Sequence, residues 1–230
     1  MIDIHSHILP FVDYRSDDSE KSIELLKNIA SQGVDKVICT PHYKRGIYEL
    51  TTHQIKTKFN EFNNLVKERN IPIKLYLGSE ILCDDKIYDN IKQGKVLTIN
   101  DTKCILIEFS YFNDTDIVDY AYNIKLLGYI PVIAHVERYS YLKAQDLIEL
   151  KKIGALIQVN SSSITGESGK EFRKKALITI KNGLVDFIAS DAHVNRKVDM
   201  ENAFKIVKRK FGKTIASSLF EENAKILTDC

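Results

Sequence analysis

Met1-Ile-Asp-Ile-His-Ser-His7 opens the chain, and its alternation of apolar and polar residues is typical of a β-strand. In an extended backbone every second side chain points to the same face, so His5 and His7 are expected to converge. Imidazole nitrogens bind Zn, Fe, Mn and Cu, and a His-x-His pair at a strand end is a common way to hold such an ion. Two exposed polar residues are the ordinary alternative, so the interpretation depends on whether the pattern recurs.

Short apolar segments rich in β-branched residues do recur along the chain. They predict seven strands, at Ile2–His5, Lys36–Thr40, Ile73–Gly78, Cys104–Phe109, Pro131–Ala134, Ala155–Val159 and Asp186–Ala189. Helical spacing predicts helices at Ser19–Gln32, Thr52–Arg69, Asp84–Gln93, Asp116–Leu127, Ala144–Ile153, Ser168–Asn182, Met200–Lys210 and Lys213–Leu227. We expect Asp17 or Asp18 to cap the first helix, and Ser168 with Glu171 to form a capping box.

The regular alternation of strands and helices predicts the fold class. Such alternation gives an α/β fold whose parallel sheet is covered by helices, either an open doubly wound sheet or a closed barrel. A count of seven strands, with no glycine-rich nucleotide loop after the first, favours the barrel. The 230 residues, 44% of them hydrophobic, suit a single domain over residues 1–230.

Composition limits the classes of partner. The net charge is +2, and the clusters Arg173-Lys-Lys175 and Lys208-Arg-Lys210 are best explained as solvated helix faces, so no nucleic-acid partner is expected. The four cysteines form no Cys-x-x-Cys pair and are expected to be reduced. Neither a signal peptide nor an apolar run of ~18 residues is visible, so we expect a soluble, cytoplasmic protein without membrane insertion.

Ligand-type side chains follow six of the seven predicted strands. In parallel α/β folds the loops after the carboxyl ends of the strands build the active site. The side chains expected there are His5, His7, His42, Glu80, Glu108, His135, Asp191 and His193. Any one of them is more often an ordinary polar group at a strand end. A set made so uniformly of His, Glu and Asp predicts a metal site with more than one ion.

The donor atoms and two nearby arginines indicate phosphate chemistry. Nitrogen and oxygen donors suit Mn, Fe or Zn, and two ions about 3.5–4 Å apart generate a hydroxide and clamp a phosphoryl group. Arg138 and Arg196 stand beside the predicted site, and guanidinium groups bind phosphate oxygens in bidentate fashion. Surface salt bridges are the alternative role for both arginines.

The motifs taken together resemble the polymerase-and-histidinol-phosphatase (PHP) superfamily. Within it, the opening Met1-Ile-Asp-Ile-His-Ser-His-Ile-Leu-Pro10, Leu106-Ile-Glu-Phe109 and Pro131-Val-Ile-Ala-His-Val-Glu-Arg138 are similar to the tyrosine-protein phosphatases of Gram-positive capsule and exopolysaccharide loci. The resemblance covers nearly the whole chain. It implies a distorted seven-stranded βα barrel and a cytoplasmic enzyme that dephosphorylates the tyrosine-rich tail of a kinase controlling polysaccharide synthesis.

The resemblance also implies three metal ions, usually manganese, and a role for each residue. One ion would be held by His5, His7, Glu80 and Asp191. The second would be held by Glu80, Glu108 and His135, and the third by His42, His193 and an aspartate near position 13. Arg138 and Arg196 would bind the phosphate, and His42 or an aspartate of the first loop, such as Asp13, would protonate the leaving group.

One departure from the family pattern concerns the third ion. Relatives usually continue the opening motif as Gly-x-Asp-Asp-Gly, whereas this chain reads Phe11-Val-Asp-Tyr-Arg15, so Tyr14 replaces the second aspartate. Asp13, Asp17 or Asp18 is then expected to serve instead; otherwise the third ion binds weakly.

Three rival functions remain open at this point. A histidinol-phosphate phosphatase or another small-molecule phosphoesterase would use much the same ligands. A non-catalytic regulatory protein would keep the metal and lose turnover. Cys39 and Arg45 match the Cys-x5-Arg signature of thiol-dependent tyrosine phosphatases, but Pro41 removes a backbone donor from that loop and Cys39 is expected to be a buried strand residue.

Overall fold

The computed structural model describes residues 1–13 and 18–229, in which two sheets of parallel strands form the centre of the fold. The first sheet has the order β1 (Ile2–Ser6), β2 (Lys36–Cys39) and β4 (Lys74–Leu77). The second has the order β3 (His42–Tyr43), β5 (Glu80–Leu82), β6 (Cys104–Glu108), β7 (Ile130–Ile133), β8 (Leu156–Asn160) and β9 (Phe187–Ala189). The predicted α/β fold with parallel strands is confirmed.

Two of the predicted strands are followed by short strands that the sequence did not predict. β2 is followed by β3 and β4 by β5, so the described residues contain nine strands where seven were expected. The two segments stay hydrogen-bonded to each other across these breaks. Gly78 N donates to Cys39 O over 2.8 Å, and Glu80 N donates to Pro41 O over 3.1 Å. Each predicted strand therefore continues past its break into the second sheet.

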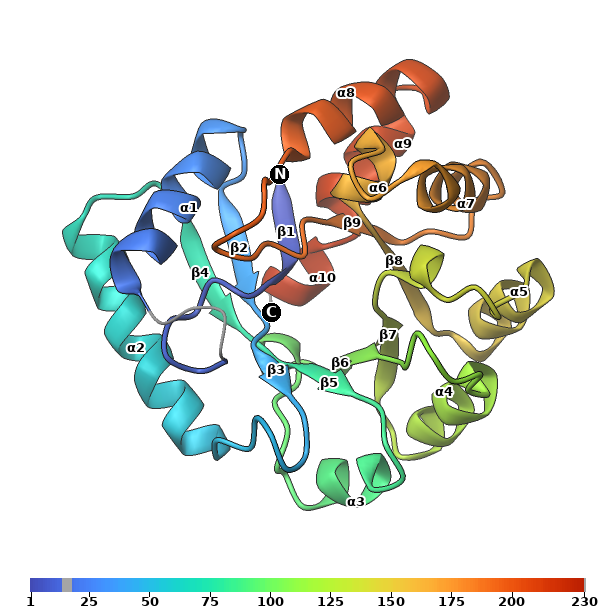
Figure 1. Ribbon diagram of the computed structural model, residues 1–230, viewed down its shortest axis with the longest axis horizontal. Coiled ribbons are helices and arrows are strands. Elements are labelled where there is room, and N and C mark those ends of the chain that lie inside the picture. The colour runs from blue at the N-terminus through green and yellow to red at the C-terminus, as the bar shows by residue number, and fades with distance from the viewer. Residues whose placement is uncertain (14–17, 230) are drawn as a thin grey trace.

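Helices surround the strands on the outside (Figure 1). The longer ones are α1 (Ser19–Ser31), α2 (Thr52–Glu68), α4 (Ile117–Leu126), α5 (Ala144–Ile153), α7 (Lys170–Lys181) and α8 (Met200–Phe211). The shorter ones are α3 (Ile87–Lys92), α6 (Ser161–Thr165), α9 (Lys213–Ser217), α10 (Lys225–Thr228), η1 (Ile99–Asp101), η2 (Val136–Arg138) and η3 (Ser218–Glu222). Within the described ranges, no helix has the length and apolar character needed to cross a membrane.

The helix caps agree only in part with the predictions. Asp18 caps α1, and its carboxylate accepts a hydrogen bond from Glu20 N over 2.9 Å. The capping box expected at Ser168 is wrong, because the Ser168 hydroxyl donates to Ser162 Oγ over 2.8 Å and Gly169 occupies the N-cap of α7. The single helix expected over Lys213–Leu227 is divided into α9, the π-helical η3 and α10.

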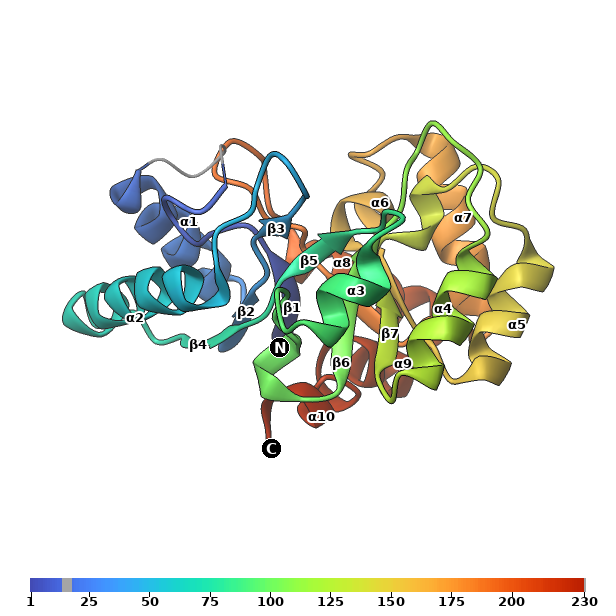
Figure 2. The ribbon, with the colours of Figure 1, turned by 90° about the horizontal axis from the view of Figure 1, so that it is seen from below.

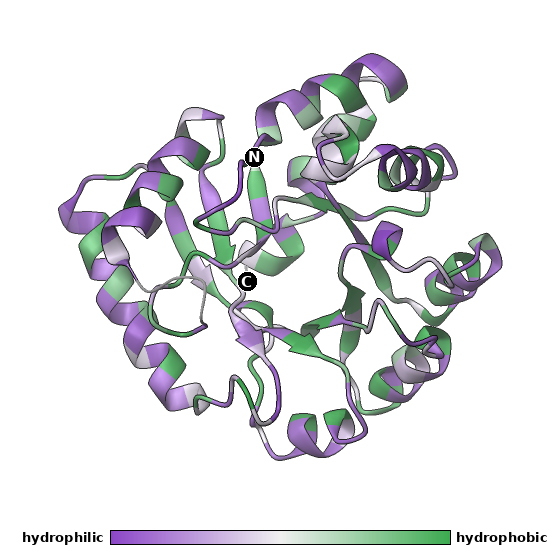
Figure 3. Ribbon diagram, in the orientation of Figure 1, coloured by the Kyte–Doolittle hydropathy of each residue, from purple (hydrophilic) through white to green (hydrophobic). Residues whose placement is uncertain are grey.

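Apolar side chains fill the space on both faces of the strands. Figure 3 shows helices that are hydrophilic on their outward faces and strands that are largely hydrophobic. The larger core cluster joins the helices to the sheets. A smaller cluster includes Ile4 and Phe187 from the strands and packs against Ala224 and Leu227 near the C-terminal end. Figure 2 shows α10 below the strands and the loops that follow β3 and β6 above them.

Hydrogen bonds bring the first strand beside the segment that follows the last. Asp191 N donates to His5 O over 3.0 Å, and His7 N donates to Ala192 O over 2.7 Å. Ser6 and Ala192 form a parallel bridge at the same place. Side chains from the two ends of the chain therefore share the rim at the carboxyl ends of the strands.

Candidate metal centre

A break in strand pairing aims the first two histidines. β1 pairs in register with β2 at Ile2 and Asp3, and the register shifts before Ser6. Irregularities of this kind re-aim side chains and are frequent beside active sites. His5 Nε2 and His7 Nε2 lie 3.2 Å apart and both side chains are buried, so the expected convergence is observed.

Glu80 lies at the centre of the cluster. Its Oε1 is 3.2 Å from His5 Nε2 and 3.0 Å from His135 Nε2. Its Oε2 is 3.2 Å from His7 Nε2 and 3.4 Å from His42 Nε2. One buried carboxylate therefore lies beside four imidazoles that come from three different segments of the chain.

Asp13 joins this cluster from the first loop. Its Oδ2 is 3.2 Å from His7 Nδ1 and 2.9 Å from His42 Nδ1. Its Oδ1 is buried and, among the described residues, has no hydrogen-bond partner. A buried carboxylate oxygen without a donor is unfavourable unless a cation or water pairs with it. The expected substitute Asp18 caps α1 instead, and Tyr14 and Asp17 lie outside the described residues.

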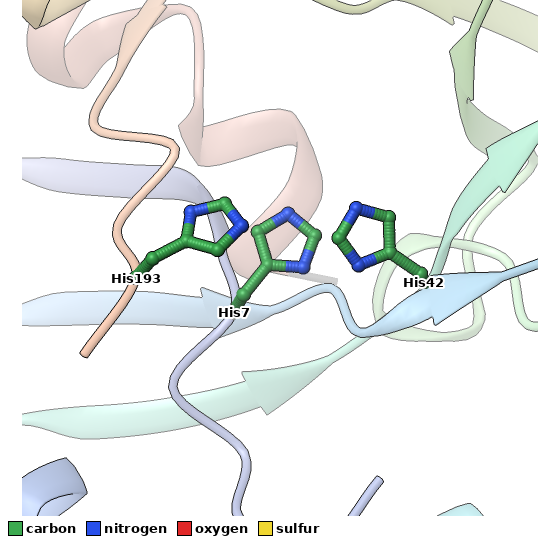
Figure 4. Close-up of side chains that lie close together, drawn as sticks. All are labelled: His7, His42 and His193. Atoms are coloured by element: carbon green, nitrogen blue, oxygen red, sulfur yellow. The ribbon is translucent and has the colours of Figure 1, made fainter. Parts of the chain in front are cut away.

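The rings of His193, His7 and His42 lie in a row (Figure 4). The His7 ring stacks on His42 with centroids 4.0 Å apart and on His193 with centroids 4.3 Å apart. His7 directly follows β1, His42 lies in β3, and His193 lies in the loop after β9.

Asp191 connects the histidines to the arginines. Its Oδ2 accepts from Arg138 Nη2 and from Asn160 Nδ2, each over 2.9 Å. Arg196 is farther away, with Nη1 at 3.6 Å, and its side chain is 45% exposed. Asp191 Oδ1 lies 3.5 Å from His7 Nε2. Arg138 is therefore held firmly at the rim, whereas Arg196 remains accessible.

Glu108 and Tyr111 complete the rim beside Arg138. The Tyr111 hydroxyl donates to Glu108 Oε1 over 2.5 Å and accepts from Arg138 Nη1 over 3.4 Å. Glu108 Oε1 is 3.7 Å from His135 Nε2. Tyr111 thus links the carboxylate of one rim loop to the guanidinium of another.

Two of these residues have strained backbones. His135 has φ of 31° and Asp191 has φ of 52°, both in the left-handed region that non-glycine residues rarely occupy. Such strain persists where surrounding contacts determine the conformation, and it clusters at functional sites.

Burial and neighbouring charges shift the pKa values of the histidines in opposite directions. Burial lowers the pKa of His7, but hydrogen bonds to Asp13 and Glu80 outweigh it and raise that pKa to about 10. Burial, helped by the charge on His7, lowers the pKa of His193 to about 3. His193 is therefore neutral at pH 7, which is the form that binds metals.

The carboxylates and His135 show the same influence of burial. Burial and the negative Glu80 raise the pKa of Glu108 to about 7. Burial lowers the pKa of His135 to about 4 although Glu80 favours its charged form. The ionised Glu80 thus opposes ionisation of Glu108, and a cation bound beside both would favour the charged form of each.

Three residues of the site were not predicted. Gln158 Oε1 accepts from His135 N over 2.8 Å and lies 3.3 Å from His5 Nδ1. The buried Asp3 accepts from Ser190 N over 2.9 Å. Asp3 lies two residues before His5 in its strand, and Gln158 two residues before Asn160, so both point to the same face as a residue of the rim. This spacing could have identified them. Tyr111 carried no such signal.

The thiol alternative is disfavoured by the surroundings of Cys39. Its side chain is fully buried in β2, and burial raises the pKa of the thiol, which is opposite to what a nucleophile needs. Arg45 does not face Cys39 but pairs with Asp84 over 3.0 Å and Asp85 over 2.7 Å.

The side chains present fit metal ions. Ligand atoms lie within 4.8 Å of one another in three groups: His5, His7 and Glu80; His7, His42 and His193; and His42, Glu80 and Glu108. All the donors are nitrogen or oxygen, as divalent Mn, Fe and Zn accept. Two observations point to the same conclusion: imidazole nitrogens approach one another closely, and Asp13 Oδ1 is buried without a partner in the part of the chain that the structure describes.

The hollow that contains these residues has a volume of about 480 Å³. Its lining includes His42, Glu80, Glu108, His135, Arg138, Asp191, His193 and Arg196. His5, His7 and Asp13 are not part of this lining, but each contacts Glu80 or His42, so the predicted site residues form one cluster.

Comparison with known proteins agrees with this geometry. The family model for capsular polysaccharide synthesis, CpsB/CapC, matches residues 1–229. Tyrosine-protein phosphatase YwqE of Bacillus subtilis is 34% identical over 99% of this chain and 91% of its own length. Tyrosine-protein phosphatase CpsB of Streptococcus pneumoniae is 33% identical over 100% of this chain and 99% of its own.

Solved structures extend the comparison to three dimensions. A crystal structure from work on YwqE of B. subtilis and CpsB of S. pneumoniae, described as metal-dependent tyrosine phosphatases, superposes with a TM-score of 0.91 at 32% identity, covering 100% of this chain and 95% of that one. Histidinol phosphate phosphatase of Lactococcus lactis shares the fold at a TM-score of 0.54 and 17% identity. The family expected from the sequence motifs is confirmed: this chain belongs to the CpsB/CapC family of capsular polysaccharide synthesis.

Proposed function

We propose that this protein is a metal-dependent protein-tyrosine phosphatase. The observation that carries the proposal is the convergence of five histidines, four carboxylates and two arginines in one cluster, eight of which line the hollow, in a chain whose relatives are named tyrosine-protein phosphatases. Donors of this kind bind ions that polarise a phosphate ester, and the arginines supply charge for its oxygens.

The nine ligand-type residues would hold two to three ions, with Mn²⁺ as the first choice and Fe or Zn as alternatives. His5, His7, Glu80 and Asp191 would hold the first ion. Glu80, Glu108 and His135 would hold the second. Asp13, His42 and His193 would hold the third. The Oδ1 of Asp13, which has no hydrogen-bond partner among residues 1–13 and 18–229, supports its role in the third site despite Tyr14.

When bound, such ions lower the pKa of water and neutralise charge that develops on phosphoryl oxygens. The chain's own groups supply the remainder. Arg138, fixed by Asp191 and Tyr111, would orient one side of the phosphate, and the exposed Arg196 would close on the other. When they hold no ion, Asp13 and His42 would share a proton for the leaving phenolate, and the 2.9 Å separation of Asp13 Oδ2 from His42 Nδ1 supports this role.

We infer that the two sheets together form the distorted seven-stranded barrel of the PHP type. β2 with β3, and β4 with β5, would each count as one interrupted strand. The hydrogen bonds between β1 and the segment after β9 support closure of the ring.

The substrate we propose is the phosphotyrosine tail of a bacterial tyrosine kinase that controls capsule or exopolysaccharide synthesis, which places the enzyme in the cytoplasm. The family's link to capsular polysaccharide synthesis supports this partner. A hollow at the strand ends, rather than an enclosed cavity, suits a flexible peptide segment.

The test is to remove metal with a chelator, restore Mn²⁺, and follow phosphate release from a phosphotyrosine peptide, with a metal count on the same sample. Activity should vanish and return, and it should exceed that on histidinol phosphate. Full activity after metal removal would contradict the proposal. Greater activity on histidinol phosphate would assign the site to a small-molecule phosphatase. Metal binding without turnover would indicate a regulatory relative.

A further inference from the structure

Two of the apolar side chains that line the hollow are exposed to solvent. The side chain of Phe112 is 94% exposed and that of Ile47 is 58% exposed. Both line the hollow that contains His42, Glu108 and Arg138. They belong to the loops after β3 and β6, which lie on the same side of the sheets (Figure 2). Exposed apolar groups gathered beside a polar site often mark a ligand-binding surface.

The turn that carries Ile47 is ordered by its own backbone. Lys44 N donates to Tyr48 O over 3.1 Å, and Tyr48 N donates to Lys44 O over 2.7 Å. Ile47 N also donates to Lys44 O, over 3.0 Å. Gly46 supplies the positive φ of 74° that this tight turn requires. Ile47 is therefore presented to solvent by a hydrogen-bonded turn.

The turn that carries Phe112 is ordered by a different device. Ser110 Oγ accepts from both Phe112 N and Asn113 N, each over 3.2 Å. Tyr141 donates from its hydroxyl to Ser110 O over 2.9 Å and fixes the same turn to the body of the protein. Two independent turns thus place apolar side chains at the same opening.

We propose that Ile47 and Phe112 form a seat for the aromatic ring of phosphotyrosine while the polar floor of the hollow holds its phosphoryl group. The inference rests on the proposed phosphatase function and goes beyond it by naming residues that select the aryl ester. A tyrosine ring would remove both side chains from water, which is favourable in proportion to the apolar area covered. A phosphoserine side chain has no ring to cover them. The seat therefore distinguishes phosphotyrosine from phosphoserine by affinity and not by the rate of the chemical step.

The experiment measures Phe112→Ala and Ile47→Ala in the full chain loaded with Mn²⁺. The substrates are a phosphotyrosine peptide and the same peptide carrying phosphoserine, and inorganic phosphate is the competing ligand. We expect the KM for the phosphotyrosine peptide to rise by roughly tenfold for Phe112→Ala and roughly threefold for Ile47→Ala, as expected from the area each loses. The kcat, the inhibition constant of inorganic phosphate and the metal content should stay within about twofold of the parent values, since neither side chain carries a group that binds phosphate or a metal ion.

Matched controls come from α4, where Tyr122 and Leu126 are 52% and 67% exposed and line no part of this hollow. Tyr122→Ala and Leu126→Ala should leave every parameter unchanged, and Phe112→Leu should keep part of the affinity. An unchanged KM in both test variants would overturn the ring seat. So would a parallel loss of phosphate inhibition, which would show that the variants damage the floor.

Failure of the proposed function has a different signature. A parent protein without turnover on the phosphotyrosine peptide would contradict the phosphatase proposal and leave the seat to be judged by calorimetric binding. In that case tighter binding of phosphotyrosine than phosphoserine, lost in Phe112→Ala, supports the seat. Equal binding of the two amino acids refutes it.

Discussion

Glu80 makes the most contacts within the candidate metal centre, since its two oxygens lie within 3.4 Å of four imidazole nitrogens. Glu80→Gln replaces one of those oxygens by an amide that donates where a ligand is needed. We expect loss of bound metal and a fall in turnover of at least about 100-fold, because even residues that only support a ligand change affinity by 10- to 100-fold. Metal analysis and phosphotyrosine hydrolysis measure both effects.

Glu61→Gln is the matched control, because Glu61 is an exposed carboxylate on α2. It should leave metal content and turnover unchanged. A Glu80→Gln protein with full metal content and full activity would show that the central carboxylate is structural.

A substitution of Cys39, unlike that of Glu80, should leave the activity intact. Because its thiol is buried and its pKa is raised, Cys39→Ser should keep kcat/KM within about twofold of the parent and lose a little stability, on the order of 1 kcal/mol, from the buried hydroxyl. Peptide hydrolysis and urea unfolding check the two parts. Complete inactivity in a folded, metal-loaded variant would restore the thiol mechanism.

Among single residues, those predictable from the sequence lie at strand ends. His5, Glu80 and His135 follow apolar segments, and parallel strands bring such positions to one rim. Tyr111 could not be predicted, because its contacts with Glu108 and Arg138 depend on how a loop folds over the rim. The position of Asp13 beside His7 and His42 likewise depends on tertiary packing.

At the scale of elements, the capping box of α2 gives a measurable contribution to stability. Thr51 Oγ1 accepts from Gln54 N over 3.2 Å, and Gln54 Oε1 accepts from Thr51 N over 2.9 Å. Thr51→Ala removes the first bond and should lower the free energy of unfolding by about 1 kcal/mol in urea titrations. Thr57→Ala is the control within the same helix, since its hydroxyl donates only to His53 O and alanine is the better helix former. Equal destabilisation by both changes would contradict the cap.

The elements were predictable where the local pattern decides them. Apolar spacing located the longer helices and the centre of each predicted strand. The breaks after β2 and β4 were not foreseen, because Pro41 lies between β2 and β3 and Gly78 between β4 and β5, where hydrogen bonds to neighbouring segments set the pairing. The capping box predicted at Ser168 failed for a similar reason. The Ser168 hydroxyl donates to Ser162 Oγ, a contact that sequence spacing does not reveal.

At the scale of the whole molecule, bound metal should stabilise the fold. The candidate ligands extend from His5 to His193, so an ion joins segments that the unfolded chain keeps apart. Saturating Mn²⁺ at about 100 times its dissociation constant contributes about 2.7 kcal/mol. For a chain of this size that raises Tm by roughly 5–10 °C relative to the chelated protein. Differential scanning calorimetry measures the difference, and an unchanged Tm would argue against an ion at these ligands.

The affinity for metal should increase with pH. The metal-free site keeps a proton on His7, whose pKa is about 10, and an ion must displace that proton. Raising the pH removes the competitor, so the apparent affinity should rise on the order of tenfold per pH unit between about pH 6 and pH 8 for each proton displaced. Calorimetry in buffers of different ionisation enthalpy counts the protons. Binding without proton release would contradict the assignment of His7 as a ligand.

The hydrogen bonds that place Asp191 and Ala192 beside His5 and His7 also set when the protein can become active. Ribosomes deliver β1 first and the loop after β9 near the end of synthesis. A nascent chain therefore holds its first histidines without Asp191 and His193, and closing a loop of this length delays folding. Phosphatase activity would then begin only after almost the entire polypeptide has been released, and products of premature termination would be inert.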